Sequence, residues 1–268
     1  MKAEERPLDQ RRYWDENLDP TNLGDPLVDA CATLLAEKDF YLVPDRRFFL
    51  ELLKYNNCSL VVELGAGLSY EVIMLLQLGY RVIACDLSLS RLQLLRRLVE
   101  ELLPPEAFSR ISFIACRAEF LPFRSNQVPA IATRAVLIHT NLPKALEECK
   151  RVLSLSGVAV FSEPLARHPL VRVYRKTFAP REWQTIAQYF DQAQTQLVRG
   201  LFPLVSERYD YFFSFLAFVW QYGLRVPFLF WAFLRPLHVL DRLAFCLFPP
   251  LRRYAWFVTL ICHKSTKQ

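Results

Sequence analysis

The sequence lacks several patterns that would place it in other classes of protein. Glycine is scarce, at 7 of 268 residues, so a glycine inside a motif is more informative than usual. The 7 cysteines include no Cys-x-x-Cys pair and no cysteine–histidine spacing of a zinc site, so we expect no bound metal. Cysteines within apolar runs, such as Cys85 and Cys116, are typical of buried thiols in a reducing compartment.

The N-terminus and the charge distribution argue against two further classes. Met1 to Arg12 is charged and contains no apolar stretch of a signal peptide, which favours a cytoplasmic location. The net charge is +6, but the basic residues are dispersed and no nucleic-acid recognition motif accompanies them, so nucleic acid is not an expected partner. A solvated basic surface is the simplest interpretation, and attraction to an anionic membrane or an acidic substrate stays open.

Short apolar runs alternate with helical patterns between about Ser59 and Pro164. With 53% hydrophobic residues, the chain can bury a full core. The runs suited to strands cover residues 60–64, 81–85, 111–115, 130–133 and 158–161. This alternation predicts βαβ units, and hence an α/β fold with a doubly wound, mostly parallel sheet and helices on both faces. Right-handed crossovers place the carboxyl ends of these strands at one edge, where such sheets bind ligands.

Composition divides the sequence into three parts. These are residues 1–58, an N-terminal helical lid, residues 59–164, the ligand-binding core, and residues 165–268, a substrate cap with the final strands of the same domain. In the first part, Tyr13, Trp14 and residues 27–40 either fold over the ligand edge or pack against the core. In the last part, we expect residues 254–262 to form a strand of the sheet.

The segment from Tyr211 to Leu234 is rich in Phe, Leu, Trp and Tyr and carries a single charge, Arg225. Its length would suffice to cross a membrane. Arg225 near its middle, Pro227 and the need for the chain to return to the sheet argue against a crossing. We therefore expect an aromatic helical cap over the substrate edge, either wholly buried or dipping into a membrane surface, and a pocket suited to an apolar or lipid-like substrate.

A glycine-rich turn follows the first predicted strand. Gly65 and Gly67 let the backbone turn sharply and approach a ligand closely. The helix that follows offers free N–H groups and the positive end of its dipole. Asp86 ends the second strand, where a carboxylate can accept hydrogen bonds from both ribose hydroxyls of an adenosine ligand. Its alternative role is that of N-cap of the helix that begins near Ser88.

The glycine turn differs from the dinucleotide-binding fingerprint. That fingerprint requires Gly-x-Gly-x-x-Gly, whereas the last position is Tyr70, preceded by Ser69. The Tyr-x-x-x-Lys pair of short-chain dehydrogenases is absent from the sequence. A membrane-associated NAD(P) oxidoreductase is therefore the least favoured of the functions that we retain.

Four stretches, in this order and spacing, resemble the motifs of class I S-adenosylmethionine (SAM)-dependent methyltransferases. They are residues 62–67 (VELGAG), the acidic-x-Gly-x-Gly motif, residues 85–88 (CDLS), the acidic end of the second strand, residues 117–123 (RAEFLPF), the "DAExLPF" loop, and residues 135–153, the "LhH…aLrEirRVL" stretch. The resemblance covers residues 59–164 and extends to the final strand. It implies a sheet of seven strands and SAM as the cofactor.

The resemblance also assigns roles to individual residues. It places the methionine end of SAM on the side chain or backbone of Glu63, Gly65, Ala66 and Gly67. It places the ribose on Asp86, and the adenine against Leu87, Ala118 and Glu119. Arg134, just past the fourth strand, would lie beside the cofactor.

Four positions depart from the family pattern. They are Ser69 in place of a third glycine, Arg117 in place of the acid that meets the adenine amine, Val128-Pro129 in place of Phe-Asp, and Leu155-Ser156-Gly157 in place of Pro-Gly-Gly. These departures leave open a protein that binds SAM without turnover, for regulation or assembly.

Methyl transfer from a sulfonium is an in-line displacement that needs alignment and exclusion of water more than catalytic side chains. Where the acceptor is a hydroxyl, His139 or Glu163 would act as the base, because both follow strands at the ligand edge. Each has a structural alternative, as a hydrogen-bonded histidine and as an anchor for the turn at Pro164. His168, Tyr174 and Arg175 are weaker candidates for the substrate pocket. The sequence favours a hydrophobic small-molecule or lipid-like acceptor, and names neither the acceptor nor the oligomeric state.

Overall fold

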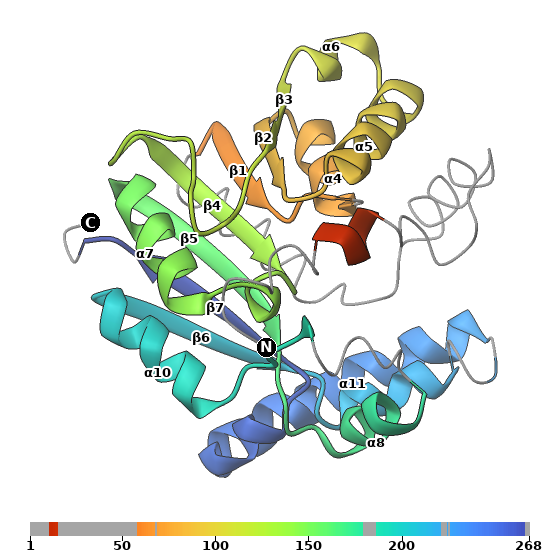
Figure 1. Cartoon of the computed structure of the whole chain (residues 1–268). Coiled ribbons are helices and arrows are strands. Elements are labelled where there is room, and N and C mark those ends of the chain that lie inside the picture. The colour runs from red at the N-terminus through yellow and green to blue at the C-terminus, as the bar shows by residue number, and fades with distance from the viewer. Residues whose placement is uncertain are drawn as a thin grey trace.

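The sheet has seven strands in the order β3-β2-β1-β4-β5-β7-β6, with helices on both faces (Figure 1). The computed structural model describes residues 11–15, 58–67, 69–178, 186–220, 224 and 226–265. The strands are β1 Leu60–Leu64, β2 Arg81–Asp86, β3 Ile111–Ala115, β4 Val128–Arg134, β5 Leu153–Pro164, β6 Leu204–Asp210 and β7 Phe257–His263. β1 to β5 are parallel, and β7 runs antiparallel between β5 and β6. The predicted α/β fold with a doubly wound, mostly parallel sheet is confirmed.

The central parallel strands β1 and β4 are buried on both faces, which is why their residues form nearly continuous apolar runs, whereas the edge strand β3 is partly exposed. Successive side chains of β1 point in opposite directions. Val61 packs with the helices α4 (Tyr70–Gln77) and α5 (Leu89–Leu102). Val62 packs on the other face, with α7 (Leu142–Val152) and α10 (Gln192–Leu201).

Short polar side chains fix where the helices begin. Ser69, Ser88 and Asn141 are the N-caps of α4, α5 and α7, and each side-chain oxygen accepts a hydrogen bond from a backbone N–H of the first turn. The remaining helices are α6 Pro105–Phe108, α8 Pro169–Thr177, α11 Pro227–Leu247 and the 3-10 helices η1 Leu137–His139, η2 Ser214–Ala217 and η4 Pro249–Tyr254. These caps set the helix starts at the carboxyl edge of the sheet, beside the expected ligand.

Residues beyond β5 divide between the sheet and an aromatic layer. The strands β6 and β7 complete the sheet, and α10 packs against it. The helices α8 and α11 lie below the sheet in Figure 1, and η2 contacts α11. A separate cluster holds η2 against α11, built from Tyr211, Phe218, Phe230 and Phe257. Within the described part of the chain, no helix is long and apolar enough to cross a membrane. Arg225 lies outside the described residues.

Of the proposed N-terminal lid, the structure describes a helix over residues 11–15. Residues 27–40 lie outside the described residues. The aromatic side chain of Trp14 packs edge-on against His139, with ring centroids 5.3 Å apart. Asp15 accepts a hydrogen bond from Ser88 at 2.5 Å. This short helix therefore lies against the carboxyl edge of the sheet.

Candidate cofactor and acceptor site

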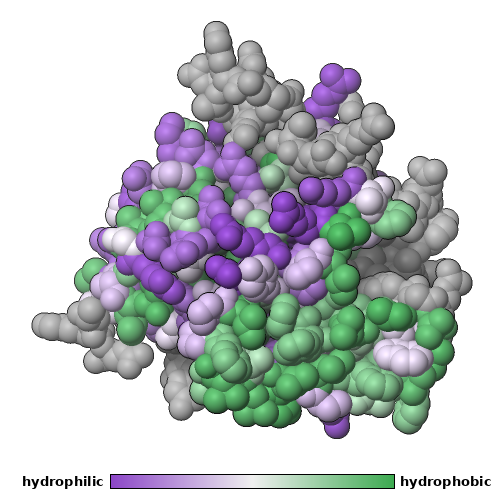
Figure 2. Space-filling model, turned by 90° about the horizontal axis from the view of Figure 1, so that it is seen from below, coloured by the Kyte–Doolittle hydropathy of each residue, from purple (hydrophilic) through white to green (hydrophobic). Residues whose placement is uncertain are grey.

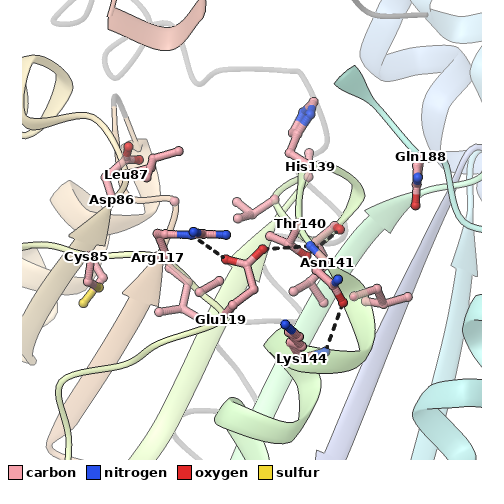
Figure 3. A pocket seen from close by; sticks show the side chains of 18 of the residues that line it. Cys85, Asp86, Leu87, Arg117, Glu119, His139, Thr140, Asn141, Lys144 and Gln188 are labelled. Carbon is pink, nitrogen blue, oxygen red and sulfur yellow. Dashed lines mark hydrogen bonds and ion pairs between the residues drawn. The ribbon is translucent and has the colours of Figure 1, made fainter. Parts of the chain in front are cut away.

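A pocket of about 1130 Å³ opens at the carboxyl edge of the parallel strands (Figure 3). Its wall combines the ends of β1, β2 and β4, the loop after β3, and the first turns of α7 and α10. Trp14 contributes to the same wall from the N-terminal helix. Parallel α/β sheets bind their ligands at this edge, so the pocket lies where the topology predicts it.

The glycine turn, residues 65–67, is hydrogen-bonded to the end of β2. Gly65 has φ +70°, a conformation that side chains with a Cβ rarely adopt, and an added Cβ would overlap the side chain of Val136. The N–H of Gly67 donates to Oδ2 of Asp86 at 2.9 Å. Ala66 is fully buried, and its N–H donates to the carbonyl of Cys85 at 3.0 Å. Of these three turn residues, Gly65 lines the pocket.

Asp86 lies in the pocket wall at the end of β2. Its Oδ1 accepts a hydrogen bond from the N–H of Ser88 at 2.8 Å, and its Oδ2 accepts the one from Gly67. Burial raises the pKa of this carboxyl, and the backbone N–H groups of Ser88, Gly67 and Leu87, together with the charge of Arg91, oppose that shift. The alternative role as N-cap is wrong, because Ser88 caps α5. Each carboxylate oxygen keeps a second lone pair, enough to accept the two hydroxyls of a ribose.

Hydrogen bonds and an ion pair connect the buried Glu63 to the pocket through Ser69, Glu71 and Arg134. The hydroxyl of Ser69 donates to Oε1 of Glu63 and lies 3.1 Å from Oε2 of Glu71. Arg134 pairs with Oε1 of Glu71 at 2.8 Å and lines the pocket, whereas Glu63 is buried behind the turn. The serine that replaces the third glycine therefore both caps α4 and bridges two carboxylates. The sequence analysis did not identify Glu71. Its position in the first turn of a helix does not indicate that it pairs with Arg134, which is 63 residues further along the chain.

Leu87, Ala118 and Glu119 also line the pocket, and their role at the adenine stays a prediction. Glu119 receives a hydrogen bond from the N–H of Asn141 at 2.8 Å. Its other oxygen lies 3.5 Å from Nε of Arg117 (Figure 3). Arg117, which replaces the usual acid, is therefore paired with Glu119, two residues later in the same loop.

His139 lines the pocket beside Trp14. Its Nδ1 lies 3.3 Å from the carbonyl oxygen of Ile186. Because a carbonyl can only accept, Nδ1 carries the proton and Nε2 of the neutral ring keeps its lone pair. Burial lowers the pKa of His139 to about 4, so the ring is uncharged at neutral pH.

Glu163 is completely buried at the end of β5 and does not reach the pocket wall. Its Oε1 accepts hydrogen bonds from the hydroxyl of Thr133 at 3.0 Å and from the N–H groups of Val136 and Leu137 at 3.2 and 3.0 Å. The N–H of Ile138 lies 3.4 Å from Oε2. Burial raises the pKa of Glu163 to about 7, against the effect of these donors. The carboxyl thus ties down the turn that leads to His139.

That turn departs from ordinary backbone geometry. Ala135, which lines the pocket directly after β4, has φ +54°. Non-glycine residues seldom take this conformation, and it persists where surrounding contacts impose it. Here the N–H of Ala135 donates to the carbonyl of Ser162 at 2.8 Å, one residue before Glu163.

The weaker sequence candidates have structural partners outside the pocket wall. His168 caps α8 by accepting from Val171 at 3.2 Å. Arg175 donates to the carbonyl of Leu165 at 2.8 Å and lies over the ring of Tyr189. Tyr174 is half exposed on α8. Sequence reasoning instead missed polar groups that do line the pocket: Arg91, Thr140, Asn141, Lys144, Gln188 and Gln194.

A family model described as a methyltransferase domain matches residues 62–161. This range contains the glycine turn, Asp86, Glu119 and Arg134, the groups that the geometry brings to one pocket. Residues 62–161 are therefore similar to a methyltransferase domain, the class of enzyme that the sequence motifs predicted. The predicted enzyme class and its cofactor, SAM, are confirmed. No curated protein sequence matches the chain.

Solved structures match this chain over 78% to 98% of its length. A geranyl diphosphate C-methyltransferase from Streptomyces coelicolor A3(2), in complex with S-adenosyl-L-homocysteine, has a TM-score of 0.61 at 15% identity and covers 98% of this chain and 100% of its own. A geranyl diphosphate methyltransferase in complex with sinefungin has a TM-score of 0.60 at 16% identity, covering 97% and 99%. The [4+2]-cyclase SpnF has a TM-score of 0.50 at 15% identity, covering 78% and 75%. At these identities the likeness concerns the fold alone.

Proposed function

We propose that this methyltransferase moves a methyl group from SAM to a hydrophobic small-molecule or lipid-like acceptor. The observation that carries the proposal is one continuous pocket in which Asp86 and the glycine turn share a wall with Trp14 and His139. Its volume of about 1130 Å³ exceeds the usual range for one small ligand, roughly 300–1,000 Å³. Donor and acceptor can therefore occupy it together.

The chemistry of the lining suits each part of SAM. Asp86 would accept the ribose hydroxyls, and Leu87 and Ala118 would contact the adenine. At the methionine end, Arg134 would pair with the carboxylate, and the acids Glu63 and Glu71, which lie behind the pocket wall, would place negative charge near the ammonium group. The backbone of residues 65–67 leaves room for the ligand because Gly65 has no side chain.

When bound, SAM supplies an electrophilic methyl group, and the chain's own residues orient the acceptor and exclude water. His139 is the residue that we place next to the reacting atoms, with a neutral Nε2 that can accept a hydrogen bond from an acceptor hydroxyl. Trp14 covers the ring of His139 and shields it from water. We assign Glu163 to the position of this turn and not to the acceptor, because four hydrogen bonds occupy it behind the pocket wall.

An apolar acceptor is supported by the side chains around the polar groups. The wall includes the apolar residues Trp14, Leu87, Phe120, Leu142 and Leu197. The solved neighbour that spans 98% of this chain acts on geranyl diphosphate, an isoprenoid. The test is release of S-adenosylhomocysteine from the purified chain with a panel of isoprenoid, quinone, fatty-acid and polar acceptors. Turnover with polar acceptors alone would overturn the apolar assignment.

The second candidate is a protein that binds SAM without turnover. This candidate is favoured by Arg117, which occupies the position where the family has an acid. The side chain of Arg117 forms an ion pair with one carboxylate oxygen of Glu119. Tight binding of SAM together with no S-adenosylhomocysteine release across the panel would select this candidate.

Asp86→Ala is expected to weaken SAM binding by about 1–3 kcal/mol, because the ribose hydroxyls lose a charged acceptor in a buried site. Calorimetry with SAM measures the effect. Asp86→Asn, which keeps one acceptor oxygen, should fall between the two. Glu106→Ala removes an exposed carboxylate from α6 and serves as the control. An unchanged affinity in Asp86→Ala would exclude Asp86 from the ribose site.

A further inference from the structure

One face of the molecule carries a broad hydrophobic surface. Figure 2 looks at the molecule from below, the side on which Figure 1 places α8 and α11, and shows a broad area of hydrophobic side chains there. On α11 and the residue that follows it, the exposed apolar side chains range from 42% to 78% exposure: Phe228, Phe233, Val239, Leu240, Leu243, Leu247 and Phe248. We call these residues the apolar face. Contiguous exposed apolar surface of this kind marks an interaction site on a soluble protein.

The pattern of α11 explains why this face stays outside the core. Its inner stripe is Phe230, Leu234, Asp241 and Phe245, which are buried against η2 and the sheet. At about 100° per residue, the apolar face occupies the opposite side of the helix. A helix that is apolar all round is normally buried all round, whereas α11 is covered on one side by the described residues.

Among the described residues of α11 and η4, every exposed charged side chain is basic. Arg235 and Arg242 are exposed and lie two turns apart along one margin of it. The single acid of α11, Asp241, is fully buried and accepts hydrogen bonds from the N–H groups of residues 212–214. Arg252 and Arg253 follow on η4, exposed beside the end of the helix.

A second helix repeats this combination. α8 exposes Leu170, Val173 and Tyr174, and its sequence contains basic residues but no acid. It is tied to the same layer through its cap, since the ring of His168 lies 4.6 Å from that of Phe215 in η2. Apolar side chains with a basic margin are the composition of helices that lie in the interface of an anionic membrane.

We propose that the apolar face docks on an anionic lipid surface, with α11 lying parallel to the membrane plane and its arginines among the headgroups. The charge distribution favours lipid over a second copy of the chain. A symmetric dimer through this face would bring two arginine margins together without an acid between them. Phosphate headgroups instead neutralise each arginine, while the apolar side chains enter the acyl boundary. The inference is independent of the identity of the acceptor.

The test is flotation of the full-length chain with vesicles of phosphatidylcholine, with and without phosphatidylglycerol. The wild-type chain is expected to float with the anionic vesicles and to bind them less as salt increases. Arg235→Ala and Arg242→Ala should each weaken binding roughly fivefold, since each arginine contributes about that factor near an anionic surface. Leu243→Ser should weaken it by about tenfold through lost apolar burial.

Two matched controls separate the face from general surface effects. Leu155→Ser changes an exposed leucine of β5 outside the apolar face, and Arg97→Ala changes an exposed arginine of α5. Both should bind vesicles as the wild-type chain does. SAM binding by calorimetry should be unchanged in all five variants, so a failure of docking and a failure of the proposed function are distinguishable.

Three outcomes would overturn the inference. The wild-type chain could stay unbound with anionic vesicles at low salt. The two controls could lose binding as much as the variants of the apolar face. Sedimentation could show a dimer that Leu243→Ser dissociates, which would make the face a contact between copies of this chain.

Discussion

Glu163→Ala is expected to lower the free energy of unfolding by about 3 kcal/mol at pH 5. The variant leaves the N–H groups of Val136 and Leu137 and the hydroxyl of Thr133 buried without their acceptor. Each such loss costs roughly 1–3 kcal/mol, and entry of water into the gap offsets part of it. Thermal or urea denaturation measures the change. Glu106→Gln, at an exposed carboxylate, should change stability by less than about 0.5 kcal/mol.

The pH dependence of Glu163→Gln gives the sharper comparison. The folded pKa of Glu163 is raised to about 7, above its ordinary value of 4.5, because burial penalises the charged form. Such a group contributes stability that is fully present below pH 4.5 and is lost as pH rises through 7. Glutamine keeps one acceptor oxygen and does not titrate. The wild-type advantage over Glu163→Gln should therefore shrink by about 3 kcal/mol between pH 4.5 and pH 8.

Kinetics distinguish a positioning role from a catalytic one. If Glu163 holds the turn before His139, Glu163→Gln should keep kcat within a few-fold, whereas Glu163→Ala should mainly raise KM as the turn loosens. A loss of kcat above about 100-fold in a stably folded Glu163→Gln would instead place this carboxyl at the acceptor. A stability difference that is identical at pH 5 and pH 8 would contradict the raised pKa.

The central parallel strands were predictable from the sequence because both faces of these strands pack against helices. Nearly all their residues are therefore apolar. The run of residues 60–64 is identical in bounds to β1, and Arg81–Asp86 extends the predicted run by one residue. β6 was not predicted. Its residues, Leu204–Asp210, include Ser206, Glu207 and Arg208, since an edge strand need not be apolar on both faces.

The candidate site was predictable where a residue acts through its position in the chain. Asp86 ends β2 and Gly65 follows β1 directly, so topology alone brings both residues to one edge of the sheet. Glu163 was placed at the same edge by this argument, and its side chain nevertheless turns inward, where residues 136–138 present their N–H groups. The link from Ser69 through Glu71 to Arg134 depends on side-chain reach across two loops, which no spacing rule contains.

Gly65→Ala is expected to weaken SAM binding by at least about 30-fold, or roughly 2 kcal/mol. The added methyl group faces two obstacles at once. The backbone at φ +70° is strained for alanine, and the new Cβ would overlap the side chain of Val136. The turn must shift to relieve both, and the shift moves the backbone that lines the cofactor pocket.

Two other glycines separate these contributions. Gly79 has φ +90° but lies away from the pocket, with 3.4 Å between an added Cβ and Arg110, so Gly79→Ala should cost stability and leave SAM affinity intact. Gly200 lies in α10 with nothing within 4 Å of an added Cβ, so Gly200→Ala should be neutral or stabilise the helix by about 0.5–1 kcal/mol.

Calorimetry with SAM and thermal denaturation across the three alanine variants measure both quantities. Adding Val136→Ala to Gly65→Ala removes the overlap but not the strain, and should therefore restore part of the lost affinity. Full SAM affinity in Gly65→Ala would mean that the backbone of the turn does not approach the cofactor. The site would then depend on Asp86 and Arg134, and the glycine would serve only the tight packing between the turn and the segment after β4.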